Sequence, residues 1–170
     1  DADQGGARPT MVSWGANNST TAGIRFDIDL NQTNGYRLRA EFNSSGLNFT
    51  TAARSDLRGA GWVHCAVVMP QGATVSQVLG YLDGELATAT VEPSGSGGVA
   101  INTSSANDVT IGNWATDDAR PFRGILDDVR IHTRALSATE IAALAAQSPD
   151  QTTAANWFFR HTGHDLPDAA

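Results

Sequence analysis

Two alternating segments joined by a short polar loop constrain the fold more than any other feature of the sequence. Residues 24–30 read Ile-Arg-Phe-Asp-Ile-Asp-Leu and residues 36–42 read Tyr-Arg-Leu-Arg-Ala-Glu-Phe, with Asn-Gln-Thr-Asn-Gly between them. Both segments place an apolar residue at every second position, which is the periodicity of a strand with one buried face. The spacing therefore predicts a β-hairpin over residues 24–42.

The register of this hairpin follows from its two faces. With Leu30 opposite Tyr36, one face is entirely apolar and the other sets every acid against a base. A slip of one residue would destroy both patterns. We expect the charged face to point away from the core as a ladder of exposed ion pairs, each contributing little to stability; an anionic or sugar ligand on this face is the alternative. The predicted charged pairs are Asp29 with Arg37, Asp27 with Arg39, and Arg25 with Glu41.

Short apolar segments separated by turn residues extend the β pattern to residue 132. Residues 81–86 contain Asp83-Gly84, a two-residue turn whose central positions favour positive φ. Residues 62–69 are apolar on both faces apart from His64, which indicates a central strand covered on each side. The pattern is typical of an all-β sandwich. Other predicted strands are residues 109–111, 124–131 and, within a long loop, 99–102.

The chain changes character after residue 132. Ser137 and Glu140 have the spacing of a capping box, and Ile141 and Leu144 begin an apolar stripe, so a helix of about ten residues is predicted. The sequence thus divides into a polar lead-in (residues 1–10), a sandwich (11–147) and a tail or linker (148–170). The tail contains Trp157, Phe158 and Phe159 on a second short predicted helix.

Composition excludes several classes of partner and site. The 170 residues suit one domain, and 11 basic against 18 acidic residues give a net charge of −7. We therefore expect no nucleic-acid partner and no attraction to acidic membranes. The single cysteine, Cys65, excludes an internal disulfide, and no apolar run is long enough to span a membrane. Because the sequence begins at Asp1, we expect a processed piece of a larger protein.

Four further motifs occur in an order that resembles a known family. They are residues 61–68 (GWVHCAVV), 80–86 (GYLDGEL), 110–114 (TIGNW) and 122–144 (FRGILDDVRIHTRALSATEIAAL). In this order they resemble the laminin-G-like domains of bacterial secreted proteins, over residues 11–144. The resemblance implies a concanavalin-A-like jelly roll: an antiparallel two-sheet sandwich with a short C-terminal helix, in a secreted or cell-surface protein.

The resemblance also implies strands that precede the segment at residues 9–15. The sequence holds no residues for them, so an edge and an apolar face of the sandwich are expected to need a cover. We expect another protein chain, or a cleaved upstream fragment, to supply it. The alternatives are the lead-in at residues 1–10 and the aromatic tail at 157–159.

No catalytic constellation is found. Sandwich glucanases of this superfamily use Glu-x-Asp-x-x-Glu on one strand, and none of the four glutamates has that spacing. Asp27 and Asp29 share a face, but we expect the opposing arginines to hold both ionised, which is wrong for a general acid. Trp62 and His64 are predicted to be structural, and Cys65 a small core residue. We expect a protein that is not an enzyme.

The resemblance implies one candidate metal site. The aspartate of the closing strand commonly contributes to a calcium site in related domains, and Asp127 matches it in Leu-Asp-Asp-Val-Arg. Alternation places Asp127 on the side of Ile125 and Val129, so we expect its carboxylate to be buried and to need a partner. Calcium, backbone donors or an arginine would each serve.

The candidate ligand site is the loop that follows residue 112. An indole face and paired hydrogen-bonding side chains are the means by which proteins bind sugars. A polar connection whose tryptophan covers the end of the sandwich explains the same residues equally well. The candidate ligand-binding residues are Asn113, Trp114, Asp117, Asp118 and Arg120.

These observations favour a non-catalytic module for carbohydrate recognition or adhesion, with a polysaccharide or glycan as its partner. The alternative is a structural self-assembly module that pairs its strand edges with another chain. Binding to one class of polysaccharide separates the first from the second, for which concentration-dependent association is expected.

Overall fold

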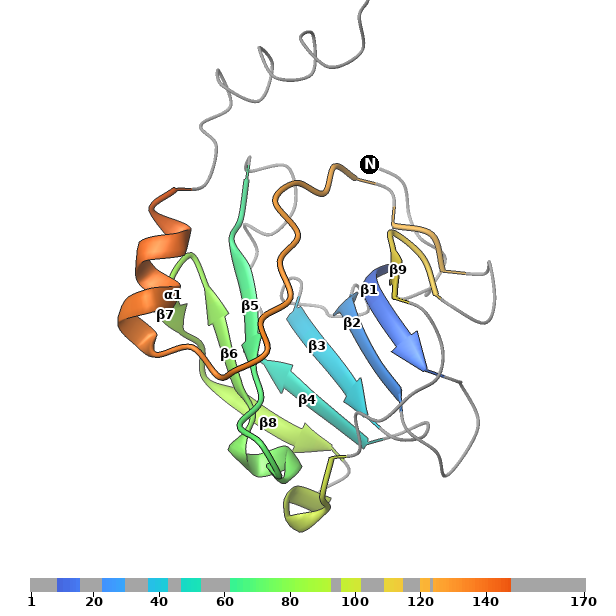
Figure 1. The fold of residues 1–170 in the computed structure, drawn as a ribbon. Coiled ribbons are helices and arrows are strands. Elements are labelled where there is room, and N and C mark those ends of the chain that lie inside the picture. The colour runs from blue at the N-terminus through green and yellow to red at the C-terminus, as the bar shows by residue number, and fades with distance from the viewer. Residues whose placement is uncertain are drawn as a thin grey trace, which may run out of the picture.

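The hairpin predicted from the sequence forms the middle of the larger of two antiparallel sheets (Figure 1). The structure is a computed structural model of the 170-residue chain. It describes residues 9–15, 23–29, 37–42, 47–52, 62–92, 96–101, 109–114, 120–122 and 124–147. The predicted all-β class, with two antiparallel sheets and one short helix, is confirmed.

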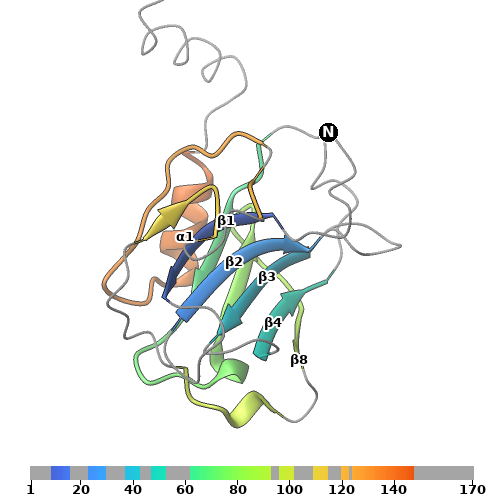
Figure 2. The ribbon, with the colours of Figure 1, turned by 90° about the vertical axis from the view of Figure 1, so that its right-hand side faces the viewer.

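The larger sheet has six strands in the order β8-β4-β3-β2-β1-β9. Figure 2 turns the molecule so that β1 to β4 lie in front and α1 behind them. The strands are β1 (Thr10–Gly15), β2 (Gly23–Asp29), β3 (Arg37–Phe42), β4 (Leu47–Thr51), β8 (Ala89–Glu92) and β9 (Thr110–Ile111).

The predicted hairpin register is confirmed residue by residue in the pairing of β2 with β3. Asp29 lies opposite Arg37, Asp27 opposite Arg39, and Arg25 opposite Glu41. The apolar partners alternate with them, because successive side chains of a strand point to opposite faces of the sheet.

The smaller sheet has three strands in the order β5-β6-β7, namely β5 (Cys65–Val68), β6 (Leu79–Leu82) and β7 (Glu85–Leu86). Asp83 and Gly84 form the turn between the last two strands, with φ of 52° and 82°. The predicted two-residue turn is therefore confirmed. The short 3-10 helices η2 (Val75–Gln77) and η3 (Ser96–Gly98) lie in the connections beside the sheets.

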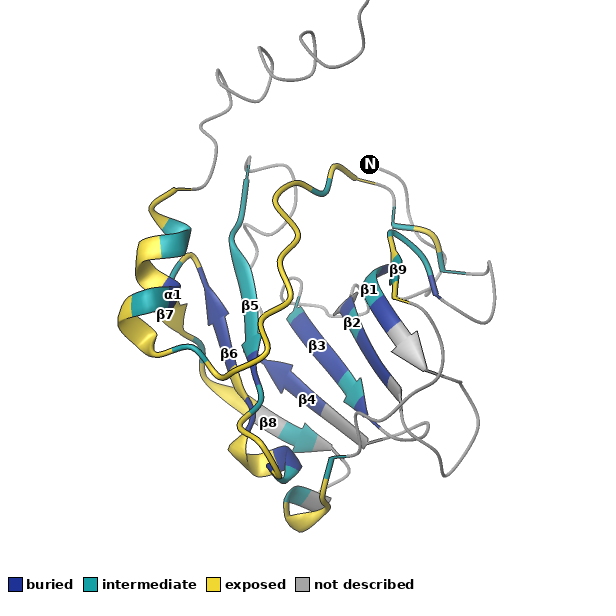
Figure 3. Cartoon of the chain, in the orientation of Figure 1, coloured by how far each residue is buried: buried dark blue, intermediate teal, exposed yellow. Residues whose placement is uncertain are grey.

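The core lies between the two sheets (Figure 3). Gly80 of β6 marks a close approach of the sheets, because a Cβ atom placed there would lie 2.8 Å from the ring of Phe49 on β4. Val67 of β5 packs against the same core. The buried core residues are Ile24, Ala40, Phe42, Phe49, Val75 and Val78.

The helix α1 (Ala138–Ala145) covers the other face of the smaller sheet. Its capping box is formed as predicted, since Ser137 accepts a hydrogen bond from the Glu140 backbone and the Glu140 carboxylate accepts one from the Ser137 backbone. Ile141 is buried against Val68 and Tyr81. None of the described helices has the length and apolarity that crossing a membrane requires.

Three secondary-structure predictions are wrong. Residues 124–131 form no strand, and Ile125, Val129 and Ile131 are exposed. Among the described residues β5 pairs only with β6, so within that part of the chain it lies at an edge of its sheet rather than at the centre, although both its faces are covered. In its described part, the predicted strand at residues 99–102 forms an isolated bridge between Ala100 and Thr74 instead of a strand. The helix predicted in the tail lies outside the described residues.

Candidate functional site

The charged face of the β2–β3 hairpin is buried, which corrects the prediction of an exposed ladder. Asp27 is 0% exposed, and Arg25 and Arg39 are nearly as inaccessible. These residues lie on the face of the six-stranded sheet opposite the apolar core, so the sheet buries polar groups on one side and apolar groups on the other. The alternation fixed which residues share a face but not whether that face is covered.

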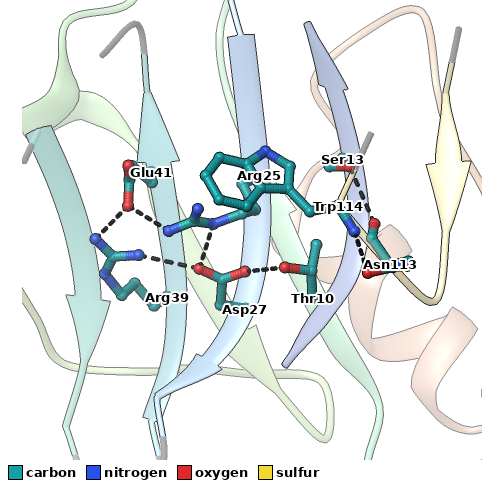
Figure 4. A network of polar contacts seen from close by, with 8 residues as sticks. All are labelled: Thr10, Ser13, Arg25, Asp27, Arg39, Glu41, Asn113 and Trp114. Carbon is teal, nitrogen blue, oxygen red and sulfur yellow. Dashed lines mark hydrogen bonds and ion pairs between the residues drawn. The ribbon is translucent and has the colours of Figure 1, made fainter. Parts of the chain in front are cut away.

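Two arginines and two acids on this face form a closed ring of ion pairs (Figure 4). Arg25 donates to Asp27 over 2.7 Å and to Glu41 over 2.6 Å. Arg39 donates to Asp27 over 3.0 Å and to Glu41 as well. Each carboxylate therefore has two guanidinium partners and each guanidinium two carboxylates. Such reciprocal, charge-assisted bonds compensate for removing four charges from water.

Burial dominates the titration of Asp27. It raises the pKa of the Asp27 carboxyl above its ordinary value, while the charges of Arg25 and Arg39 and the hydrogen bond from Thr10 act in the opposite direction. The arginines act in the predicted direction on Asp27, but they do not outweigh the effect of burial on its pKa. Both Asp27 and Glu41 are occupied by two arginines, so neither is placed to protonate or attack a substrate.

The ring is tied to the candidate ligand loop through a tryptophan. The guanidinium of Arg25 lies 4.5 Å from the centre of the Trp114 ring, and that of Arg120 lies 4.8 Å from it. Both distances are within the range of cation–π attraction. Trp114 itself is only 9% exposed. The Trp114 ring therefore packs against guanidinium groups of the protein itself. This agrees with the alternative in which the tryptophan covers part of the sandwich and does not contact a ligand.

Backbone contacts hold the same loop against β1. The Thr10 backbone donates to the Arg120 carbonyl over 3.1 Å, and the Thr10 hydroxyl donates to Asp27 over 2.9 Å. On the other side of the loop, Ser13 donates to the Asn113 carbonyl over 3.1 Å. Asp27, Thr10, Arg120, Trp114 and Arg25 thus form a continuous circuit from the sheet to the loop and back.

The structure brings together three of the five candidate ligand-binding residues. Asn113 lies beside Trp114, whose backbone N–H donates to the Asn113 side chain over 2.8 Å. Arg120 lies over the Trp114 ring and is half-buried. Asp117 and Asp118 lie outside the described residues.

The sequence missed the partners of this loop. Arg25, Asp27, Arg39 and Glu41 were identified as a charged face, but nothing in their spacing linked them to Trp114. β1 supplies Thr10 and Ser13 to the same face of the sheet, but because the register shifts between Thr10 and Val12, simple alternation does not predict this. Thr50, opposite Arg39 in the neighbouring strand, is also buried here, and its hydroxyl has no hydrogen-bond partner in the described part of the chain.

The residues just before β5 and at its start are less buried, and one of them makes fewer hydrogen bonds, than the sequence predicted. Trp62 and Cys65 are half-buried rather than buried in the core. The Nδ1 atom of His64 is buried and has no hydrogen-bond partner among the described residues, which corrects the expected contact with a neighbouring loop. Burial lowers the pKa of His64, and the charge of Asp83 opposes that shift.

Asp127 is exposed, so the prediction of a buried carboxylate is wrong. Its side chain accepts a hydrogen bond from the backbone of Asp128 over 2.8 Å, and Asp128 pairs with Arg130. No group of three or more His, Cys, Asp or Glu side chains suited to a metal occurs in the described ranges. The described residues around Asp127 therefore do not by themselves fit a calcium ion, and calcium binding stays a prediction.

Comparison with known families gives one match. A laminin-G family model, described as the concanavalin A-like lectin/glucanases superfamily, matches residues 2–142. Comparisons with curated proteins and with solved structures gave no significant match. The match spans most of the chain and agrees with the two antiparallel sheets and the capped helix. The chain therefore belongs to the laminin-G-like family of the concanavalin A-like lectin/glucanases superfamily.

Proposed function

We propose that this domain is a non-catalytic carbohydrate-recognition or adhesion module of a secreted or cell-surface protein. The observation that carries the proposal is the circuit joining the buried charges of the large sheet to Arg120 at the edge of the loop. Family membership supports a module of the carbohydrate-binding or adhesion type. The occupation of Asp27 and Glu41 by arginines supports a role without catalysis.

The circuit favours ligand recognition because it holds the guanidinium of Arg120 in a defined position beside the six-stranded sheet. Arg120 is half-buried over Trp114, and its backbone is fixed by Thr10. A guanidinium held in this way loses little conformational freedom on binding, and its planar N–H groups pair with neighbouring oxygen atoms of a ligand. We therefore place Arg120, rather than the Trp114 ring, at the centre of the proposed ligand contact, and Asn113, Asp117 and Asp118 remain candidate ligand-binding residues.

A glycan array tests this function directly. We expect binding to one class of glycan, lost when Arg120→Ala removes the guanidinium and retained in Arg134→Ala, which removes an exposed arginine near α1. A repeat with a chelator separates calcium-dependent from calcium-independent binding. A blank array, or equal binding by both variants, would contradict the proposal at this site.

A further inference from the structure

The guanidinium of Arg25 has partners of two kinds. Its Nε atom donates to Asp27 over 2.7 Å, and one of its Nη atoms donates to Glu41 over 2.6 Å. These N–H groups lie in the plane of the guanidinium, so the two ion pairs leave its flat face for other contacts. The centre of the Trp114 ring lies 4.5 Å from the central carbon of the same guanidinium. Arg25 therefore connects the buried ring of charges with the loop that follows β9.

Trp114 reaches Arg25 across the strand that separates them. It follows β9, and β1 lies between β9 and β2 in the sheet. Figure 4 shows the Trp114 side chain extending over β1 toward Arg25. Ser13 of β1 lies directly opposite Arg25 in the register and is 1% exposed. A small side chain at this position leaves room for the indole ring to reach the next strand.

The Trp114 ring also contacts the arginine that we propose for ligand binding, since the guanidinium of Arg120 lies 4.8 Å from the ring centre. Backbone hydrogen bonds hold the main chain nearby. Phe122 donates to the Gly112 carbonyl over 2.8 Å, and Thr10 donates to the Arg120 carbonyl. The Arg120 guanidinium, however, is several rotatable bonds away from the main chain. Its position therefore depends on side-chain contacts, of which the Trp114 ring is one.

We infer that Arg25 is a positioning residue for the proposed ligand site: it holds the Trp114 ring in place and, through the ring, the guanidinium of Arg120. Arg25 is only 5% exposed, so it does not itself reach a ligand. Its two charge-assisted hydrogen bonds fix its orientation before any ligand arrives. The consequence for binding rests on the proposed function, whereas the arrangement of the three side chains can be measured without a ligand.

Arg39 provides a matched control for this role. It pairs with the same two carboxylates as Arg25 and is buried to a similar extent. It lies on β3, one strand farther from β1 and the loop. Lysine at either position keeps the positive charge but lacks the planar fork that pairs with two carboxylates at once. Both substitutions should therefore weaken the buried ring of charges, but Arg25→Lys should also remove the guanidinium that lies against Trp114.

The test compares these two variants of the full chain by NMR without a ligand. Amide exchange at Thr10 and Phe122, relative to the amides of β6, reports how well the loop is attached. The shift of the Arg120 guanidinium resonances, which the nearby indole ring displaces, reports the position of that group. In Arg25→Lys we expect about tenfold faster exchange at both amides, and Arg120 resonances close to those of an exposed arginine. In Arg39→Lys we expect exchange within about twofold of the unmodified chain and an unchanged Arg120 shift.

A second variant keeps the test decisive if Arg25→Lys does not fold. Trp114→Leu leaves the four charges of the buried ring in place and removes the indole that Arg25 contacts. It should speed exchange at Thr10 and Phe122 by a similar factor. In the Trp114→Leu background Arg25→Lys should add little, as expected for two residues that act through one contact. Unchanged exchange in Trp114→Leu overturns the inference.

The outcomes separate this inference from the proposed function. Equal effects of Arg25→Lys and Arg39→Lys on the loop, or an unchanged Arg120 shift in Arg25→Lys, overturn the positioning role. If one class of glycan binds, Arg25→Lys should weaken its binding by about tenfold and Arg39→Lys should not; equal weakening also overturns the role. A blank glycan array contradicts the proposed function, while the NMR comparison still decides whether Arg25 positions Arg120.

Discussion

The two sheets of this domain differ in how far their charged side chains are buried and in how far their edges are paired. In the six-stranded sheet the β2–β3 hairpin has neighbours on both sides, and even its charged face is enclosed. In the region of the three-stranded sheet, β5 lies at an edge and the 124–131 segment, which has strand periodicity, forms no ladder, as far as the described residues go. Where a strand has neighbours on both sides, its charged side chains are buried and form a network of ion pairs. Where a segment has no paired neighbour, its apolar side chains stay exposed to water.

The largest expected effect comes from breaking the buried ring. Asp27→Ala removes one of the two carboxylates that the buried Arg25 and Arg39 share, so we expect a loss of about 3–5 kcal/mol in the free energy of unfolding. Arg130→Ala breaks an ion pair whose members are both exposed, and should cost less than about 1 kcal/mol. Urea titrations followed by circular dichroism compare the two. Similar losses would show that the two regions do not differ in this way.

The apolar residues of the two regions offer a second comparison of similar size. Phe42→Ala removes a ring that is 1% exposed in the core and should cost about 3–5 kcal/mol. Ile131→Ala removes atoms that already face water and should change stability by less than about 0.5 kcal/mol. Urea titrations followed by circular dichroism compare the stability of the two variants. A large loss from Ile131→Ala would mean that the 124–131 segment is packed after all.

Gly80 tests how tightly the two sheets are joined. Its added Cβ would lie 2.8 Å from the Phe49 ring and 3.1 Å from a methyl of Thr51, so Gly80→Ala should cost about 1–3 kcal/mol. Gly98→Ala serves as the control, because nothing lies within 4 Å of its Cβ position. Thermal unfolding of both variants measures the difference. An unchanged melting temperature for Gly80→Ala would contradict the close approach of the sheets.

The smallest effect concerns pH and the region before β5. Burial lowers the pKa of His64 below 6.5, so the unfolded chain binds a proton more readily than the folded one. The contribution of His64 to stability is therefore complete above pH 6.5 and is lost as the pH falls toward the lowered pKa. His64→Gln should remove that part of the slope, and His132→Gln, at an exposed histidine, should leave it. Unfolding free energies at several pH values would show an unchanged slope if this explanation were wrong.

Local patterns predicted the parts of the fold whose partners lie close in the sequence. The β2–β3 register, the Asp83-Gly84 turn and the capping box at Ser137 each depend on residues within one hairpin or one helical turn. Strand pairing of residues 124–131 depends on a neighbour from elsewhere, and alternation alone cannot supply one. The prediction there failed because the pattern reports which face a residue would occupy, not whether a ladder forms.

The candidate site was predictable only in part for a similar reason. The loop residues Asn113, Trp114 and Arg120 stood out by composition, but their contact with Arg25 and Thr10 is a tertiary one between distant segments. Burial of the charged face depends on the same distant contacts. The sequence showed that the charges pair with one another, and the structure adds that they also support the loop.

Residue-level hydrogen exchange on the chain alone tests the central contrast most directly. The account predicts that amides of β3, such as those of Leu38 and Ala40, exchange at rates limited by global unfolding, because they lie in the middle of the large sheet. Amides of residues 125–131 should exchange orders of magnitude faster, since no described backbone hydrogen bond protects them. Equal protection in the two regions would contradict the account, because it would mean that the 124–131 segment already has its ladder partner.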